Sequence, residues 1–126
     1  MTSAPPKKRA GPPVVTWHEL TEFDFHRRLA HTPGTGIVLF SAPGCRACRS
    51  LEQRLPALLG DVPAQLYKVD VQQATALARA YDIFHLPSLL VFVAGAYHGE
   101  LQAEARPEPF RQALQALLAA PAQEEP

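Results

Sequence analysis

Both cysteines of this 126-residue chain, Cys45 and Cys48, lie in the stretch SAPGCRACRS at positions 41–50. Two thiols with two residues between them can form a redox pair, supply half of a metal site, or be small residues buried by chance. A zinc site usually needs four ligands, and the sequence has neither a second cysteine pair nor a closely spaced pair of histidines. The spacing by itself leaves the chemistry open, so the elements that carry the two thiols must be considered.

The residues around the pair predict a strand, a turn and a helix in that order. The segment 37–41 (IVLFS) is continuously apolar, which is typical of a strand covered on both faces. Pro43 and Gly44 predict a turn, and 45–59 predicts a helix with four leucines on one face. Pro56 is expected to kink or shorten this helix, because it lacks an N–H and its ring clashes with the preceding turn.

This arrangement places Cys45 at the N-terminus of the helix and Cys48 one turn further in. Unpaired N–H groups and the positive end of the helix dipole then face the Cys45 sulfur. Both favour the thiolate, and cysteine pKa values at such positions fall below the free value of about 8.5. We therefore predict that Cys45 is the nucleophile that attacks a disulfide. Cys48, the more buried thiol, is then the resolving residue that attacks the mixed disulfide.

A second feature is Pro87, in the segment DIFHLPSLLVF at 82–92. It stands directly before an apolar strand predicted at 88–93, and a proline at such a joint is a candidate cis peptide. An ordinary trans proline that begins a strand is the alternative interpretation.

The remaining sequence predicts a regular alternation of elements. Strands are expected at 14–17, 37–41, 64–71, 88–93 and 97–101, and helices at about 21–31, 45–59, 74–81 and 107–118. Thr21 is expected as the N-cap of the first helix, with Asp24 completing an imperfect capping box. This order predicts one α/β domain at 14–119, with a mostly parallel sheet, helices on both faces and a closing antiparallel hairpin. Residues 1–13 are expected to form a disordered tail and 120–126 a frayed one.

Composition argues against several classes of partner. Lys plus Arg and Asp plus Glu balance at 12 each, so no strong charge favours nucleic acid or a membrane surface. The N-terminal stretch MTSAPPKKRAGPP is followed by no apolar region of a secretory signal, and no segment reaches the roughly 18 apolar residues of a membrane span. We therefore expect a cytoplasmic protein, in a compartment where a close cysteine pair is more often catalytic or metal-binding than structural.

Taken together, these residues resemble the thioredoxin family over 14–118, nearly the whole predicted domain. The likeness rests on APGCRACR, on YKVDVQQ in the third strand, and on AYDIFHLPSLLVFVAG around the proline. The resemblance implies a thioredoxin fold, with a central mixed five-stranded sheet flanked by four helices, and thiol–disulfide oxidoreductase activity. It also implies a cis bond at Leu86–Pro87, with Pro87 beside Cys45. The Leu86 backbone and Gly44 would contact an extended substrate segment by strand addition.

The departures from the family pattern are as informative as the likeness. Thioredoxins proper read Trp-Cys-Gly-Pro-Cys-Lys, whereas this chain has Gly44 before the first cysteine and Arg46-Ala47 between the two. Leu39 stands where the family usually has a buried aspartate that helps remove the proton from the second cysteine. Ala103 falls where a glycine often lets the substrate approach. These changes indicate a divergent member that reduces selected partners rather than a general reductant.

Arg46, Ala47 and His85 are the candidate residues for redox tuning. A cation at Arg46 favours the Cys45 thiolate and so makes the pair a stronger oxidant, by about 30 mV or less because an exposed arginine is screened. Arg46 is equally a candidate partner contact. His85 is interpreted as a residue that tunes Cys45, as a third metal ligand, or as a partly exposed loop histidine.

Three functions follow from these alternatives. The leading one is a thiol–disulfide oxidoreductase without a cofactor or metal, expected to be a monomer. Its partners would be protein disulfide substrates and an upstream reductant, such as thioredoxin reductase or another dithiol protein. The second is a binding or chaperone module in which the CxxC is not essential. The third is a metal carrier, which the element around Leu86 and Pro87 disfavours because it occupies the space of a ligand.

Overall fold

The computed structural model describes residues 16–126, which form one sheet of five strands with four helices. The elements in chain order are β1 (Trp17–Leu20), α1 (Phe25–Ala30), β2 (Thr35–Ser41), α2 (Arg46–Leu59), β3 (Gln65–Asp70), α3 (Thr75–Ala80), β4 (Ser88–Val93), β5 (Ala96–Leu101) and α4 (Pro107–Ala119). This order confirms the predicted alternation. The predicted disordered tail at 1–13 and the first two residues of the strand predicted at 14–17 lie outside the described residues. Within the described residues this strand starts later than predicted, at Trp17, and runs on to Leu20.

The strands are arranged in the order β1-β3-β2-β4-β5. β1, β3 and β2 run parallel, whereas β4 is antiparallel to β2, and β5 is antiparallel to β4. The sheet is therefore mixed, as expected. Because β2 and β4 run in opposite directions, the end of β2 lies beside the start of β4, with Phe40 opposite Ser88. The loop that follows β2 and the loop that precedes β4 thus meet at one edge of the sheet.

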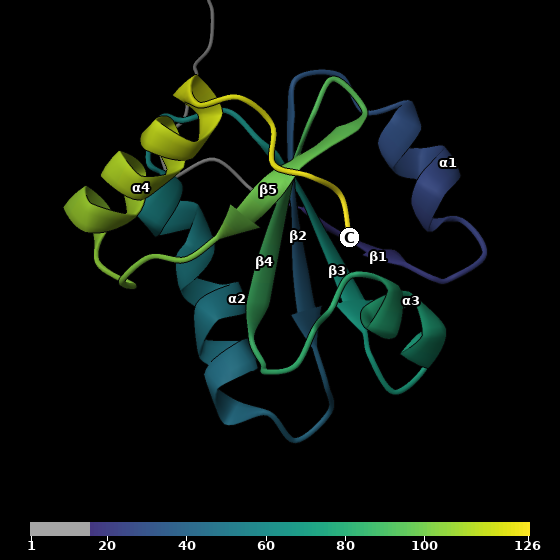
Figure 1. Cartoon of the computed structure of the whole chain (residues 1–126). Helices are drawn as coiled ribbons and strands as arrows, with labels where there is room; N and C mark the ends of the chain where they lie inside the picture. Colours follow the sequence, from purple (N-terminus) through teal and green to yellow (C-terminus); the bar gives the residue numbers. More distant parts are fainter. Residues whose placement is uncertain (1–15) are drawn as a thin grey trace, which may run out of the picture.

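Two apolar cores lie on the two faces of the sheet, and Figure 1 shows the helices on either side of it. Residues of α1 and α3 pack on one face against Val38 and Phe40 of β2. Residues of α2 and α4 pack on the other face against Ile37 and Leu39. All four of these β2 side chains are fully buried, which confirms a strand covered on both sides. Within residues 16–126, no helix is both long enough and apolar enough to cross a membrane.

The first helix begins later than its sequence predicts. The two bonds of the predicted capping box are present, because the Thr21 backbone N–H donates to the Asp24 carboxylate (2.7 Å) and the Thr21 hydroxyl accepts from Phe23 N–H (3.2 Å). They close one turn that precedes the regular helix. α1 then begins at Phe25. The Thr21 N–H holds the pKa of Asp24 below its usual value.

Pro56 does not shorten the second helix, which continues through it to Leu59. The expected loss of one helical hydrogen bond at this position is therefore tolerated within a helix whose apolar face is anchored in the core by Leu55 and Leu58.

The C-terminal segment also departs from the prediction of a frayed tail. After α4 the chain crosses over β5 (Figure 1), where Gln123 N–H donates to the His98 carbonyl (2.8 Å) and the Gln123 side chain accepts from Glu100 N–H (3.1 Å). The Tyr81 hydroxyl donates to the Glu125 carboxylate (2.6 Å). Burial raises the pKa of Tyr81, and the bond to Glu125 raises it further. The tail supplies hydrogen-bond partners to an edge strand whose outer backbone groups would otherwise rely on water.

We predict that Gln123→Ala lowers the free energy of unfolding by about 1 kcal/mol, because the Glu100 N–H loses its acceptor. Urea denaturation followed by circular dichroism would measure the change. The matched control is Gln112→Ala, at an exposed position of α4. Equal stability of the two variants would contradict a docked tail.

Candidate active site

Cys45 caps the N-terminus of α2. The loop from β2 closes with a hydrogen bond from Cys45 N–H to the Ala42 carbonyl (3.1 Å), and Gly44 adopts a φ of +82° there. That backbone conformation, rather than lack of space, favours glycine, because a Cβ at this position would meet no atom within 4 Å. The Cys45 sulfur accepts a hydrogen bond from Cys48 N–H (3.2 Å). The first N–H groups of α2 thus point toward Cys45, as predicted from sequence.

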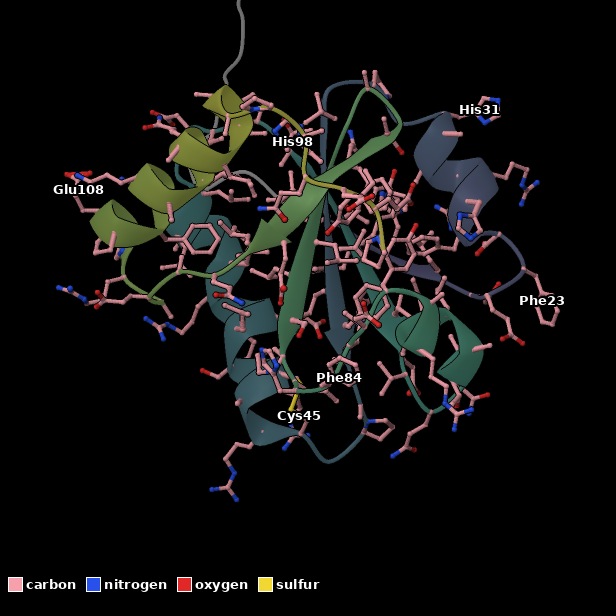
Figure 2. The ribbon with its side chains drawn as sticks, in the orientation of Figure 1. Phe23, His31, Cys45, Phe84, His98 and Glu108 are labelled. Atoms are coloured by element: carbon pink, nitrogen blue, oxygen red, sulfur yellow. A yellow bond between two sulfur atoms is a disulfide. The ribbon has the colours of Figure 1, made fainter. Side chains whose placement is uncertain are left out.

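Cys45 and Cys48 form a disulfide, with their Cα atoms 5.3 Å apart. Figure 2 shows this bond at the end of the molecule where α2 begins. Cys48 is 1% exposed and belongs to the core, whereas Cys45 is only half-buried. The pair therefore has one sulfur that a partner can approach and one that it cannot, which is the asymmetry that sequential thiol exchange requires.

The Leu86–Pro87 peptide bond is cis. Its loop is held at the start of β4 by the Ser88 hydroxyl, which donates to the His85 carbonyl (2.7 Å). Leu86 and Pro87 are both half-buried, and Leu86 packs against the core shared by α1 and α3. The antiparallel pairing of β2 with β4 brings this loop to the same edge of the sheet as Cys45.

A groove of about 610 Å³ lies between α2 and the segment that follows β5. Ala47, His85 and Pro87 all line it, so the structure brings these three predicted residues together. Ala103 lines the same groove, whose apolar wall includes Leu89, Leu101 and Phe110. His85 is exposed and its side chain has no hydrogen bond within the described residues. Arg46 is exposed at the first position of α2 and, like Gly44, does not line the groove.

A second, smaller cavity of about 180 Å³ lies on the other side of the cysteine pair. It is lined by Cys48, Glu52 and Lys68, with Glu19 and Asp70 at its wall. Lys68 Nζ lies 2.9 Å from Glu52 Oε2. Sequence analysis did not single out Glu52, although its position four residues after Cys48 on a helix was a signal that the two share a face.

Phe84 is another residue that the sequence analysis missed. Its side chain is 85% exposed, which is unusual for so large an apolar group, and it precedes the cis proline by three residues. Figure 2 shows it at the same end of the molecule as Cys45. The signal in the sequence was a phenylalanine inside a loop rather than in a strand or helix.

No group of three or more His, Cys, Asp or Glu side chains suitable for a metal ion occurs within residues 16–126. His85 therefore does not form such a group with Cys45 and Cys48. Lys68 and Asp70 lie close together near the end of β3 but have different partners. Asp70 accepts a hydrogen bond from Gln72 N–H (2.8 Å), which caps the turn after β3, while Lys68 pairs with α2.

Comparison with known proteins identifies a family by sequence and a shared fold by structure. The family profile described as Thioredoxin matches residues 16–116. Protein disulfide-isomerase A3 from Gallus gallus is 35% identical over 85 residues, which are 64% of this chain and 16% of that protein. A thioredoxin from Staphylococcus epidermidis is 30% identical over 79 residues, which are 61% of this chain and 74% of that protein.

Two solved structures show the same fold at low sequence identity. Thioredoxin from Trypanosoma brucei brucei superposes with a TM-score of 0.65 at 20% identity, covering 90% of this chain and 99% of that one. The zinc-bound form of human ERp44 has a TM-score of 0.65 at 19% identity, covering 80% of this chain and 32% of that one. The chain thus spans most of the length of the single-domain relatives and a fraction of the longer ones.

We predict that iodoacetamide modifies Cys45 much faster than Cys48 in the reduced protein. Cys45 is half-buried at a helix N-terminus that favours its thiolate, whereas Cys48 is in the core. Peptide mass mapping after a short exposure at neutral pH would measure the ratio, with the unfolded chain in urea as control. Comparable labelling of the two thiols in the folded protein would contradict the assigned asymmetry.

Proposed function

Because the chain belongs to the thioredoxin family, we propose that it reduces disulfides in a limited set of partner proteins. Its relatives and its closed Cys45–Cys48 disulfide support a thiol–disulfide oxidoreductase site. The single observation that carries the proposal is the position of that disulfide. It joins a half-exposed sulfur at the N-terminus of α2 to a buried one, next to the loop of the cis proline.

The proposed reaction has two exchange steps. The Cys45 thiolate attacks one sulfur of the substrate disulfide, forms a mixed disulfide and releases the other substrate sulfur as a thiolate, which takes up a proton. Cys48 then loses its proton and attacks the Cys45 sulfur. This step releases the second substrate sulfur and closes the Cys45–Cys48 disulfide. Two electrons and two protons pass from the dithiol to the substrate in the complete cycle.

We assign substrate contact to Leu86, Pro87 and Gly44. The half-buried loop of Leu86 lies just before the paired residues of β4, where an extended segment can add its backbone. The glycine leaves open space on the other side of Cys45. The groove along α2 extends this contact surface away from the sulfur. Phe84, exposed at the same end of the molecule, offers an apolar anchor of the kind enriched at protein interfaces.

Selectivity is proposed to come from charge as well as shape. Arg46 and Arg49 are both exposed in the first turn of α2, and neither has an ion-pair partner within the described residues. The surface beside Cys45 is thus cationic, which favours partners with acidic residues near their disulfide.

The upstream partner is proposed to be thioredoxin reductase or another dithiol protein, because closing the disulfide consumes the dithiol in each cycle. We propose a cytoplasmic location and a monomeric state. Both cysteines of the chain are used in the redox pair, which leaves none for the structural disulfides common in oxidising compartments.

The decisive experiment is a redox titration of the wild-type protein in glutathione buffers together with an insulin-reduction assay. We expect a reversible Cys45–Cys48 disulfide and insulin reduction that Cys45→Ser abolishes. Cys48→Ser should instead accumulate mixed disulfides with partners. Failure to form the disulfide would overturn the proposed enzymatic activity. If Cys45→Ser still protected a partner protein from aggregation, a binding or chaperone module would be favoured instead.

For Arg46 we predict that Arg46→Glu lowers the redox potential by up to about 30 mV, because removing a cation from beside Cys45 disfavours its thiolate. A role in partner contact would be seen separately in the rate of disulfide reduction. Arg46→Glu would lower that rate several-fold more for a peptide disulfide flanked by acidic residues than for one flanked by basic residues. The control is Arg27→Glu, an exposed charge reversal on α1. If both measurements match that control, Arg46 has neither role.

A further inference from the structure

The second exchange step faces an obstacle that the first does not. Cys48 must lose a proton before it can attack, because the thiolate is the nucleophile. Its side chain is only 1% exposed, and burial in apolar surroundings disfavours the charged form. Leu39, also fully buried, belongs to the core on the α2 face and offers no acceptor for that proton.

The small cavity beside Cys48 supplies an acceptor from the helix itself. Glu52 is four residues after Cys48 on α2, so the two side chains are neighbours on one helical face. Helical side chains lean toward the N-terminus, which directs Glu52 toward Cys48. Both residues line the cavity of about 180 Å³. A space of this size with several charged side chains on its wall can hold water molecules, since each takes about 30 Å³.

Lys68 explains why Glu52 is held at this position. In the sheet Lys68 is paired with Leu39 of β2 on one side and with Glu19 of β1 on the other. Leu39 cannot pair with its ammonium group. Lys68 instead reaches across the cavity to α2, and its Nζ donates to Glu52 Oε2 at 2.9 Å. The pair is partly shielded, with the two side chains 32% and 27% exposed.

Three other charged groups face the same cavity. Asp70 at the end of β3 already accepts the Gln72 N–H, and Glu19 is an exposed residue of β1. Arg49 is exposed beside Cys48 on α2. Of the three carboxylates, only Glu52 shares a helical face with Cys48 and is fixed by an ion pair.

We propose that Glu52, positioned by Lys68, accepts the proton of Cys48 during release of the mixed disulfide. The proton passes from the Cys48 sulfur through water in the cavity to the Glu52 carboxylate. The Cys48 thiolate forms its bond to the Cys45 sulfur, and the substrate thiolate leaves with the electron pair of the broken disulfide. Glu52 then returns the proton to solvent at its exposed side. This assignment rests on the proposed function and names the proton acceptor for its second step.

The test uses the reduced full-length protein and dithiobis(nitrobenzoate), whose two thiol releases separate the two steps. The first release reports attack by Cys45, and the second reports attack by Cys48 on the mixed disulfide. We expect Glu52→Gln to leave the first phase unchanged. At about pH 7 the second phase should slow by about tenfold or more. The loss should be smaller than the full effect of removing a positioned general base, because water in the cavity partly replaces Glu52. The defect should shrink as the pH is raised, because hydroxide in the cavity water then removes the proton without Glu52.

Glu19→Gln is the matched control, because it removes the same charge from another residue that lines the cavity. Glu52→Asp should recover part of the rate. The proposal is overturned if Glu52→Gln slows the second phase no more than Glu19→Gln does, or slows it equally at every pH, as a structural ion pair would. Absence of any second phase in the wild-type protein would instead overturn the proposed function.

Discussion

The position of the active site depends on the pairing of β2 with its two neighbours. β2 runs parallel to β3 and antiparallel to β4, so the end that leads to Cys45 lies next to the start of β4. Its inward side chains alternate between two cores and are fully buried. A shift of register by one residue would move every β2 side chain to the opposite face of the sheet. Such a shift would disrupt the packing of both cores. The meeting of the Cys45 and Pro87 loops is thus fixed by the buried pairing of β2 with β4 next to them.

Much of the fold could be predicted because its signals are local. The apolar run of β2 and the leucine spacing of α2 define their elements without tertiary information. Predictions differed where side chains compete for backbone partners. Thr21 and Asp24 form their expected capping bonds around a turn, so the regular helix begins only at Phe25. The polar C-terminal segment finds partners on β5 through Gln123. Composition alone could not reveal these partners, because they are set by which edge strand lies nearby.

Some features of the site could likewise be predicted from local sequence, whereas others depend on distant segments. Strand, turn and helix around Cys45 indicated a redox pair, and the proline at the start of β4 gave the second element. The groove and the smaller cavity depend on segments far apart in the chain. Lys68 lies beside Glu52 only because β3 neighbours β2 under α2. Spacing within the helix could relate Glu52 to Cys48, but it could not show that a cation would hold it there.

Leu39 in the sheet and Glu52 on α2 balance core stability against proton transfer differently from a carboxylate buried at the Leu39 position. A carboxylate in the sheet interior would carry a large desolvation penalty, whereas Leu39 at that position contributes apolar burial to the α2 core. An acid on α2 keeps contact with solvent through its partly exposed pair with Lys68, so its charge costs less to maintain. Solvent also screens it, which makes it a weaker influence on Cys48 than a fully buried group. The arrangement therefore favours a stable core and a slower, solvent-coupled release step, which suits exchange with selected partners more than rapid general reduction.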